Sequence, residues 1–306
     1  MLHIRVACPG ELTGNLAERL RAHPGVVNLV ILPTVSAALP ADAVQLDVAS
    51  GAANSVLREL RDLGLGHDNP IIIESVDAAI TDAPHRPAWL RSHLGEHAPV
   101  WDFVEARITG EASYPPSFFA LLIFAGLIGA CGILTNSSIL IVGAMVVGPE
   151  YSAIVSVALG IERRDGHSVG QGLIVLAAGF LAAIAITLLF ALCIRWLGEI
   201  PELYRRGVRP VSDLINSPNM FSVVVAVVAA LVGVISLTMS RTATLIGVFI
   251  SVTTIPAAAD VGVSVAFGHW REARGSALQL LLNVVVLIIV GALALRGQRL
   301  VWRRWT

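Results

Sequence analysis

The sequence contains no lysine, since all 21 of its basic residues are arginine. We attribute this to genomic bias, because no single site would remove every lysine from a chain. Charged residues make up only 14% of the 306 residues, whereas 55% are hydrophobic, and the mean hydropathy is +0.75. This composition excludes an ordinary soluble domain and predicts an integral membrane protein. Membrane lipids are therefore expected partners, and a nucleic acid is not.

Cysteine is also scarce, and Cys8, Cys131 and Cys193 are too few and too scattered for a disulfide framework. His93 and His97 stand one helical turn apart, a spacing that metals use, but no third ligand accompanies them. A solvated helix face is the favoured interpretation, so no metal or other cofactor is expected. With no readable nucleophile-base pair or phosphate-binding loop, an enzyme is the least favoured class.

Charge is distributed unevenly along the chain. Residues 1–110 carry 8 Arg and 13 Asp or Glu, a net charge of −5, whereas residues 111–306 carry 13 Arg and 9 Asp or Glu, a net charge of +4. This difference predicts two parts in different surroundings. The chain opens without a basic stretch followed by an apolar run, so no secretory signal is visible and we expect the first part to stay in the cytosol.

Residues 1–85 predict a small α+β domain with elements in the order βαββαβ. Leu12, Leu16 and Leu20 recur at helical spacing, so one face of the first helix can cover a sheet. This plan is ferredoxin-like, and domains of this kind often bind small ligands or dimerise. The predicted strands are 3–8, 26–32, 44–49 and 71–76, and the predicted helices are 11–23 and 52–63.

Residues 86–116 are predicted to link this domain to the membrane part. Val100, Phe103, Val104 and Ile108 alternate with charged residues in the pattern of an amphipathic helix over 99–112. Such a helix is expected to approach the bilayer surface.

An all-α membrane domain is predicted over 117–295, followed by a basic cytoplasmic tail over 296–306. Its six hydrophobic segments mostly reach the roughly 20 residues that a crossing needs. We expect two three-helix repeats, 117–194 and 220–295, in opposite orientations because each has an odd number of crossings. The segments are 117–135, 138–161, 169–194, 220–239, 243–268 and 276–295.

The two repeats also match in sequence. The run Ser156–Gly160 recurs as Ser264–Gly268, and Arg163 recurs as Arg271. Internal repeats with interrupted hydrophobic segments are typical of secondary transporters.

The loop charges fit this topology only in part. Arg163 and Arg164 fit a cytoplasmic loop, but inversion places Arg271 and Arg274 outside, against the positive-inside tendency. Re-entrant second and fifth segments are the alternative to six crossings.

The candidate site consists of two acids near breaks in the second and fifth segments. Gly148 and Pro149 are expected to interrupt one helix and Pro256 the other, because proline lacks an N–H group. Glu150 and Asp260 stand beside these breaks, and a carboxylate at membrane depth predicts a site for a cation or a proton. The alternative is that both acids lie near an interface or pair with arginine or backbone amides.

Further polar residues flank the breaks. Asn136 and Ser137 are candidate ligands but are more typical of helix caps. Arg241 could meet an anionic substrate, although a phospholipid headgroup is its commoner partner. The candidates Ser251, Thr253 and Thr254 could offer oxygens to an ion or hydrogen-bond back into their own helix.

The membrane part resembles the bacterial hydrophobic proteins catalogued as domain of unknown function 389. The resemblance rests on Asn136-Ser137, the run Ile141–Met145 and Pro149, and on a second set that ends in Gly247 and Pro256. It covers roughly residues 115–270, and the small domain ahead of it also looks like members of that family. The family has no established activity to carry over.

The sequence thus predicts a secondary transporter or ion-coupled carrier of an unknown small solute or ion. We expect a multi-pass protein of a bacterial inner membrane and a homo-oligomer, with the first domain regulating access or holding the oligomer together. A ligand-gated channel and a membrane-anchored sensor or scaffold are the alternatives.

Overall fold

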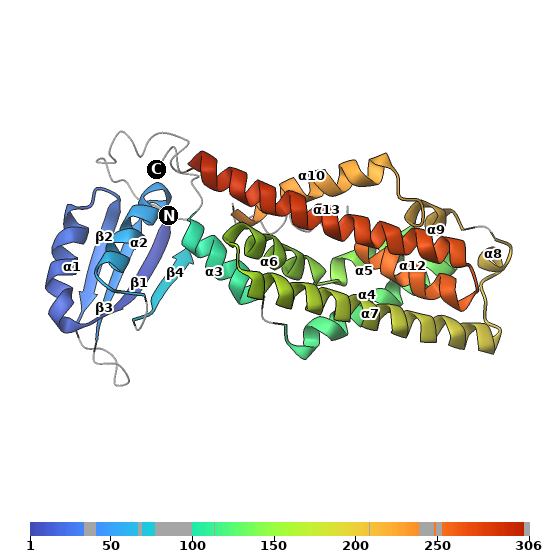
Figure 1. Ribbon diagram of the computed structural model, residues 1–306. Helices are drawn as coiled ribbons and strands as arrows, with labels where there is room; N and C mark the ends of the chain where they lie inside the picture. Colours follow the sequence, from blue (N-terminus) through green and yellow to red (C-terminus); the bar gives the residue numbers. More distant parts are fainter. Residues whose placement is uncertain are drawn as a thin grey trace. The chain divides into compact units, whose positions relative to one another are not determined.

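The computed structural model describes residues 1–33, 41–66, 69–76, 100–112, 114–207, 209–238, 248 and 253–302. The chain divides into two compact units, one built mainly on Met1–Val104 and the other on Glu105–Gln298. Each unit is described by itself below, and Figure 1 gives the element labels.

The first unit is a four-stranded antiparallel sheet with helices, which confirms the predicted mixed α+β class. The strands lie in the order β2-β3-β1-β4, so the two central strands are β1 and β3. In β1, Ile4 pairs with Leu46 of β3 on one side and with Ile73 of β4 on the other. The elements are β1 (Leu2–Cys8), α1 (Gly10–Ala22), β2 (Val26–Leu32), β3 (Asp42–Val48), η1 (Ser50–Ala52), α2 (Ala53–Asp62) and β4 (Ile71–Ser75).

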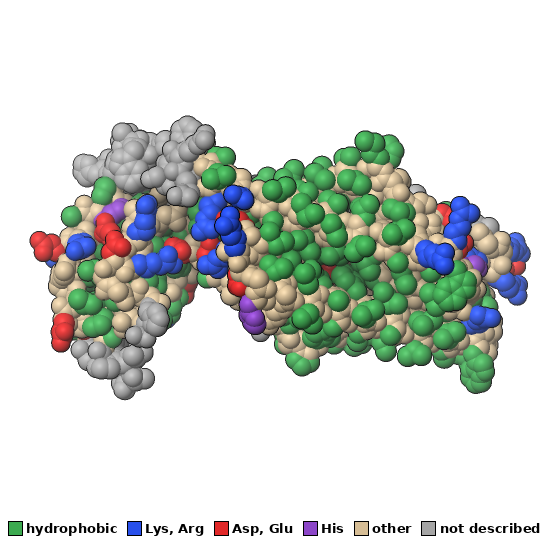
Figure 2. Space-filling view, viewed as in Figure 1, with side chains coloured by type: hydrophobic (Ala, Val, Ile, Leu, Met, Phe, Trp, Pro, Cys, Tyr) green, Lys and Arg blue, Asp and Glu red, His purple; other side chains and the backbone are tan. Residues whose placement is uncertain are grey.

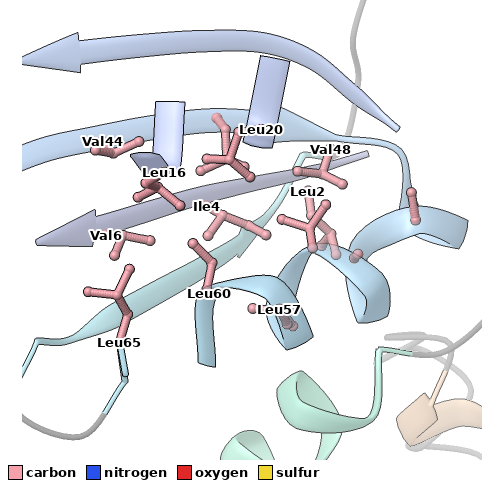
Figure 3. Packing of buried hydrophobic residues seen from close by; sticks show 14 of the residues in the cluster. Leu2, Ile4, Val6, Leu16, Leu20, Val44, Val48, Leu57, Leu60 and Leu65 are labelled. Carbon is pink, nitrogen blue, oxygen red and sulfur yellow. The ribbon is translucent and has the colours of Figure 1, made fainter. Parts of the chain in front are cut away.

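One face of the sheet forms the core of this unit. Because side chains alternate along a strand, β1 buries every second residue from Leu2 to Cys8. Leu16 and Leu20 of α1 and Leu60 of α2 pack against these positions, and all three are fully buried (Figure 3). The helical spacing in the sequence therefore identified the faces that the helices bury.

The second unit is almost entirely helical. Figure 1 shows α4, α7, α10 and α13 running along its length, with the shorter α5, α6 and α12 among them. The helix α3 (Trp101–Glu111) lies across the boundary of the two units in the sequence. The other helices are α4 (Pro116–Thr135), α5 (Ser138–Val147), α6 (Glu150–Arg163), α7 (Gly166–Leu197), α8 (Glu202–Arg205), α9 (Pro210–Ile215), α10 (Met220–Thr238), α12 (Thr254–Ala266) and α13 (Trp270–Trp302).

Four of the described helices, α4, α7, α10 and α13, are long and apolar enough to cross a membrane. The helices α5 and α6 pass the same test together but are bent by 51° at their junction, and α12 is a shorter apolar helix. Length and composition thus identify this unit as a multi-pass membrane domain. The fifth predicted segment, 243–268, is described continuously only from residue 253, so six crossings remain a prediction.

The surface of the membrane domain supports this assignment. On the face shown in Figure 2, hydrophobic side chains cover most of the domain and arginines gather toward its two ends. Exposed large residues include Ile174 and Leu181 of α7 and Leu293 of α13, each at least 63% exposed. Such exposure is costly in water and favourable in lipid.

Small residues allow the short helices to approach the long ones closely. A Cβ atom on Gly129 of α4 would lie 3.0 Å from Ala259 of α12. A Cβ atom on Gly262 of α12 would lie 2.8 Å from the carbonyl oxygen of Ile184 and 2.9 Å from the amide nitrogen of Leu188, both in α7. This packing of backbone on backbone is typical of membrane helices.

We expect Gly262→Ala to lower the stability of the protein, because the new methyl group meets backbone atoms of α7 that cannot move aside. Overpacking of this kind costs about 1–3 kcal/mol. The measurement is the thermal unfolding midpoint in detergent, and Gly143→Ala is the matched control. A Cβ atom on Gly143 of α5 meets nothing within 4 Å, and alanine favours a helix over glycine by about 1 kcal/mol. Equal midpoints for the two variants would contradict the close packing.

Candidate functional site

The bend between α5 and α6 is built from two residues. Gly148 has extended backbone (φ −70°, ψ 130°) and ends α5, and Pro149 directly precedes α6. A Cβ atom on Gly148 would collide with the Glu150 carboxylate and would lie 2.8 Å from Ile255 of α12. Glycine at this position therefore lets the two segments meet.

Glu150 is the first residue of α6, and its side chain is only 7% exposed. Its Oε1 atom accepts a hydrogen bond of 2.6 Å from the Thr254 hydroxyl. Its Oε2 atom is buried and has no hydrogen-bond partner among the described residues. Thr254 is the first residue of α12, so the amino-terminal ends of two short helices meet at one carboxylate. Free N–H groups and helix dipoles favour negative charge at such ends.

A chain of amides from α13 reaches the same helix end. Asn283 donates a hydrogen bond of 3.1 Å to the hydroxyl of Thr253, which directly precedes α12. Gln279 donates one of 3.1 Å to the Asn283 side-chain oxygen, and both amides are 2% exposed. The Gln279 side-chain oxygen is itself buried without a partner in the part of the chain that the structure describes. The Glu150 Oε2 atom and the Gln279 side-chain oxygen are therefore acceptors that could still bind a ligand.

Asp260 belongs to a separate polar cluster. It is fully buried, and its Oδ1 accepts a hydrogen bond of 2.7 Å from Ser212 of α9. Its Oδ2 accepts bonds of 2.5 Å from Ser276 of α13 and 3.5 Å from Ser264 of α12. Asp260 lies six positions after Thr254 in α12, a distance of about 9 Å along the helix axis. The two acids therefore occupy two places rather than one.

Arginine and aromatic side chains surround the end of α12. The Arg209 guanidinium lies 4.2 Å from the ring centre of Tyr204 and within 2.8 and 3.0 Å of the ring nitrogens of His269. Burial lowers the pKa of His269, and Arg209 lowers it further. Arg195 donates a hydrogen bond of 2.7 Å to the Ala266 carbonyl. These two arginines are thus engaged with groups other than Asp260.

A cavity of about 150 Å³ lies among residues of α3, α6 and α7. Its wall includes Ser156 and Ser168, which precede Ser264 and Ser276 in the sequence by the same interval. Tyr114 also lines it, and the tyrosine hydroxyl is buried with no partner among the described residues. Asp165 caps α7, and hydrogen bonds from Ser168 lower the pKa of this aspartate.

Comparison with known proteins places this region in a family. Residues 145–289 match the family model described as Domain of unknown function (DUF389). Residues 145–289 are therefore similar to this family. The search of curated proteins and the search of solved structures gave no match.

The family assignment confirms the resemblance noted in the sequence, with shifted bounds. The match begins in α5 and ends in α13, so it runs further toward the C-terminus than the predicted 115–270. Glu150, Thr254 and Asp260 all lie inside it, as do Gln279 and Asn283. Both polar clusters, including Ser212, thus lie within the matched segment.

The remaining predicted site residues lie away from the two clusters or outside the residues that the structure describes. Asn136 ends α4 in the left-handed conformation, and the Ser137 hydroxyl caps α5 by accepting a hydrogen bond of 3.4 Å from the Leu140 amide. Pro256 stands in the first turn of α12, where a missing N–H group leaves no hydrogen bond unmade. Arg241, Ser251 and the histidines 93 and 97 lie outside the described residues. Within the described part, no group of three or more His, Cys, Asp or Glu could hold a metal.

Sequence reasoning missed Ser212, Ser276 and Gln279. Ser276 could have been found, because the repeat that relates Ser156 to Ser264 also relates Ser168 to Ser276. Ser212 lies on the six-residue helix α9, which is too short for a periodic signal. Gln279 lies four residues before Asn283, so the two amide side chains share one face of a helix, and this spacing is visible in the sequence.

Thr254→Val is expected to destabilise the DUF389 domain, because it removes the hydroxyl that donates to buried Glu150 while keeping the volume of the side chain. A buried hydrogen bond to a carboxylate contributes about 1.5–3 kcal/mol. Thr254→Ser keeps the hydroxyl and is the matched variant, expected to lose only the small contribution of one methyl group. Thermal unfolding in detergent measures both, and equal losses would show that the hydrogen bond contributes nothing.

Proposed function

We propose that the protein is an integral membrane secondary transporter, an ion-coupled carrier whose binding site lies at the junction of α6 and α12. The observation that carries this proposal is the Glu150 carboxylate, which is buried and has one oxygen bonded to Thr254 and the other without a partner in the described structure. A buried acid in this condition is stabilised by a proton or by a bound cation.

The packing of the short helices supports an inverted repeat. On the α7 side, Gly172 near the start of the helix contacts Val157 of α6, and Thr187 further along contacts Gly262 of α12. On the α13 side the order is reversed, since Ser276 near the start contacts α12 and Gly291 further along contacts Ala158 of α6. Each short helix thus packs on the first part of its own long helix and on a later part of the other. This reversed order of contacts along α7 and α13 is expected for two copies related by an axis in the membrane plane.

A difference between the two copies supports alternating access. Ser156 and Ser168 border a cavity, and Ser156 is 8% exposed, whereas their counterparts Ser264 and Ser276 are 1% and 0% exposed and packed around Asp260. A carrier built from inverted repeats opens to one side by giving its two copies different conformations. We infer that this conformation is the one open at the α6–α7 end.

The first unit fits a regulatory or oligomerisation role. We infer that it is ferredoxin-like, because its βαββαβ elements form an antiparallel sheet in the order β2-β3-β1-β4. In this proposal the first unit lies on the cytoplasmic side of the membrane. The membrane in question is the bacterial inner membrane, and the carrier is a homo-oligomer.

Glu150→Gln should abolish coupled transport, because an amide carries no charge that a cation could neutralise and does not accept a proton near neutral pH. The protein is reconstituted in liposomes on a solid-supported membrane, and currents are recorded after jumps in pH, Na⁺ or a panel of small organic ions. We expect saturating currents that Glu150→Gln loses and that Glu199→Gln, an exposed acid outside the site, retains. Flux without saturation in both variants would indicate a channel, and the absence of any current would favour an anchored sensor.

Cysteine labelling tests the difference between the two copies. In a background without Cys8, Cys131 and Cys193, the variants Ser156→Cys and Ser264→Cys place a thiol at matching positions. A small membrane-impermeant thiol reagent should modify the cysteine at 156 at least tenfold faster, because that position borders the cavity. Equal rates would contradict a conformation open at only one end.

A further inference from the structure

The cluster around Asp260 has the composition of a cation site. Its oxygens come from one carboxylate and three serine hydroxyls, and the four residues belong to α9, α12 and α13. Asp260 and Ser276 are fully buried, Ser264 is 1% exposed and Ser212 is 3% exposed. Three separate elements therefore direct hydroxyl groups at one carboxylate inside the membrane domain.

The charge of Asp260 has no cationic partner among the described residues. The described hydrogen bonds to its carboxylate all come from neutral hydroxyls, and the charged neighbour that acts on it is Glu272, a second acid. Arg209 is engaged with Tyr204 and His269, and Arg195 with a backbone carbonyl. Neutral hydrogen bonds lower the cost of a buried charge but do not cancel it. The field at this place attracts a positive ion.

The donor atoms decide which ion fits. A serine hydroxyl that donates to a carboxylate can rotate and present its lone pairs to a cation instead. Oxygen-only donors select hard cations and exclude zinc and copper, which prefer nitrogen or sulfur. One carboxylate balances a single positive charge, whereas calcium sites generally use several acidic ligands. Because the hydroxyl and carboxylate oxygens already lie 2.5 and 2.7 Å apart, a small ion would displace them less than a large one.

We propose that Asp260, Ser212, Ser264 and Ser276 form a binding site for a small monovalent cation, Na⁺, distinct from the Glu150 site. In the proposed carrier this ion is the coupling ion, but its binding at Asp260 does not depend on transport through the Glu150 junction. The other repeat supplies an internal contrast. Ser152 stands where the repeat places Asp260, so the equivalent position there carries no charge.

The test is thermal unfolding of the full-length protein in detergent at constant ionic strength, with choline chloride replaced stepwise by NaCl or KCl. Ligands that bind only the folded state raise its stability by mass action. We expect Na⁺ to raise the unfolding midpoint by about 5 °C with saturation, and K⁺ to require at least tenfold higher concentrations. Equal responses to Na⁺, K⁺ and choline would overturn the proposal.

Variants locate the ion. Asp260→Asn should abolish the Na⁺ response, and Ser264→Ala, which keeps the carboxylate, should raise the half-saturating Na⁺ concentration at least tenfold. Ser156→Ala, the repeat counterpart of Ser264, is the matched control and should leave that concentration unchanged. If Asp260→Asn does not fold, the comparison of Ser264→Ala with Ser156→Ala still decides, and equal values overturn the proposal.

Glu150→Gln separates this inference from the proposed function. We expect this variant to keep the Na⁺ response even where it loses transport currents, because the two acids lie about two turns of helix apart. A response that disappears in Glu150→Gln and persists in Asp260→Asn would place the ion at the helix junction and refute a site at Asp260.

Discussion

The hydrogen bond from Thr254 to Glu150 joins the first turns of two short helices, and the arrangement of the membrane domain depends on it. The first turn of any helix has N–H groups without helical partners. In hydrocarbon no water can satisfy them, so a helix that begins inside a membrane must begin against polar groups of the protein. Glu150, the first residue of α6, accepts a hydrogen bond from the hydroxyl of Thr254, the first residue of α12, so one carboxylate lies at both helix ends. The bend between α5 and α6 and the start of α12 are thereby fixed at one place.

Small residues make this meeting point inaccessible to lipid. Gly148 allows the Glu150 carboxylate and Ile255 to lie against its backbone, and Gly129 and Gly262 bring α4 and α7 close to α12. The long helices then enclose the junction, and Glu150 is left 7% exposed. Because the enclosure removes water, it also removes the usual compensation for a charge. The same packing that encloses the short helices therefore leaves the Glu150 carboxylate buried, as the proposed proton or cation site requires.

The sequence predicted the first unit more completely than it predicted the site. Strand alternation and turn residues placed β1, β2, β3 and β4 within two residues of their bounds, because a half-buried sheet imposes a period of two. Acids inside apolar segments likewise identified Glu150 and Asp260 as unusual. Their grouping into one site rested on the proline near each acid. Since Pro256 belongs to the first turn of α12, Asp260 lies inside that helix and faces α9 and α13 instead. No local pattern could show this, because the partners come from distant parts of the chain.

The two copies of the repeat use the same hydroxyl in different surroundings. Ser168 donates to Asp165 at 2.5 Å, and its counterpart Ser276 donates to Asp260 at the same distance. Asp165 is exposed at the start of α7, where water and helix N–H groups compensate its charge. Asp260 lies in the interior, where its described partners are neutral. The difference in solvation therefore makes Asp165 a helix cap and leaves Asp260 as the acid at which we propose a bound cation. Matching serines in the two segments therefore differ in chemistry, because Ser168 contacts an exposed aspartate and Ser276 contacts a buried one.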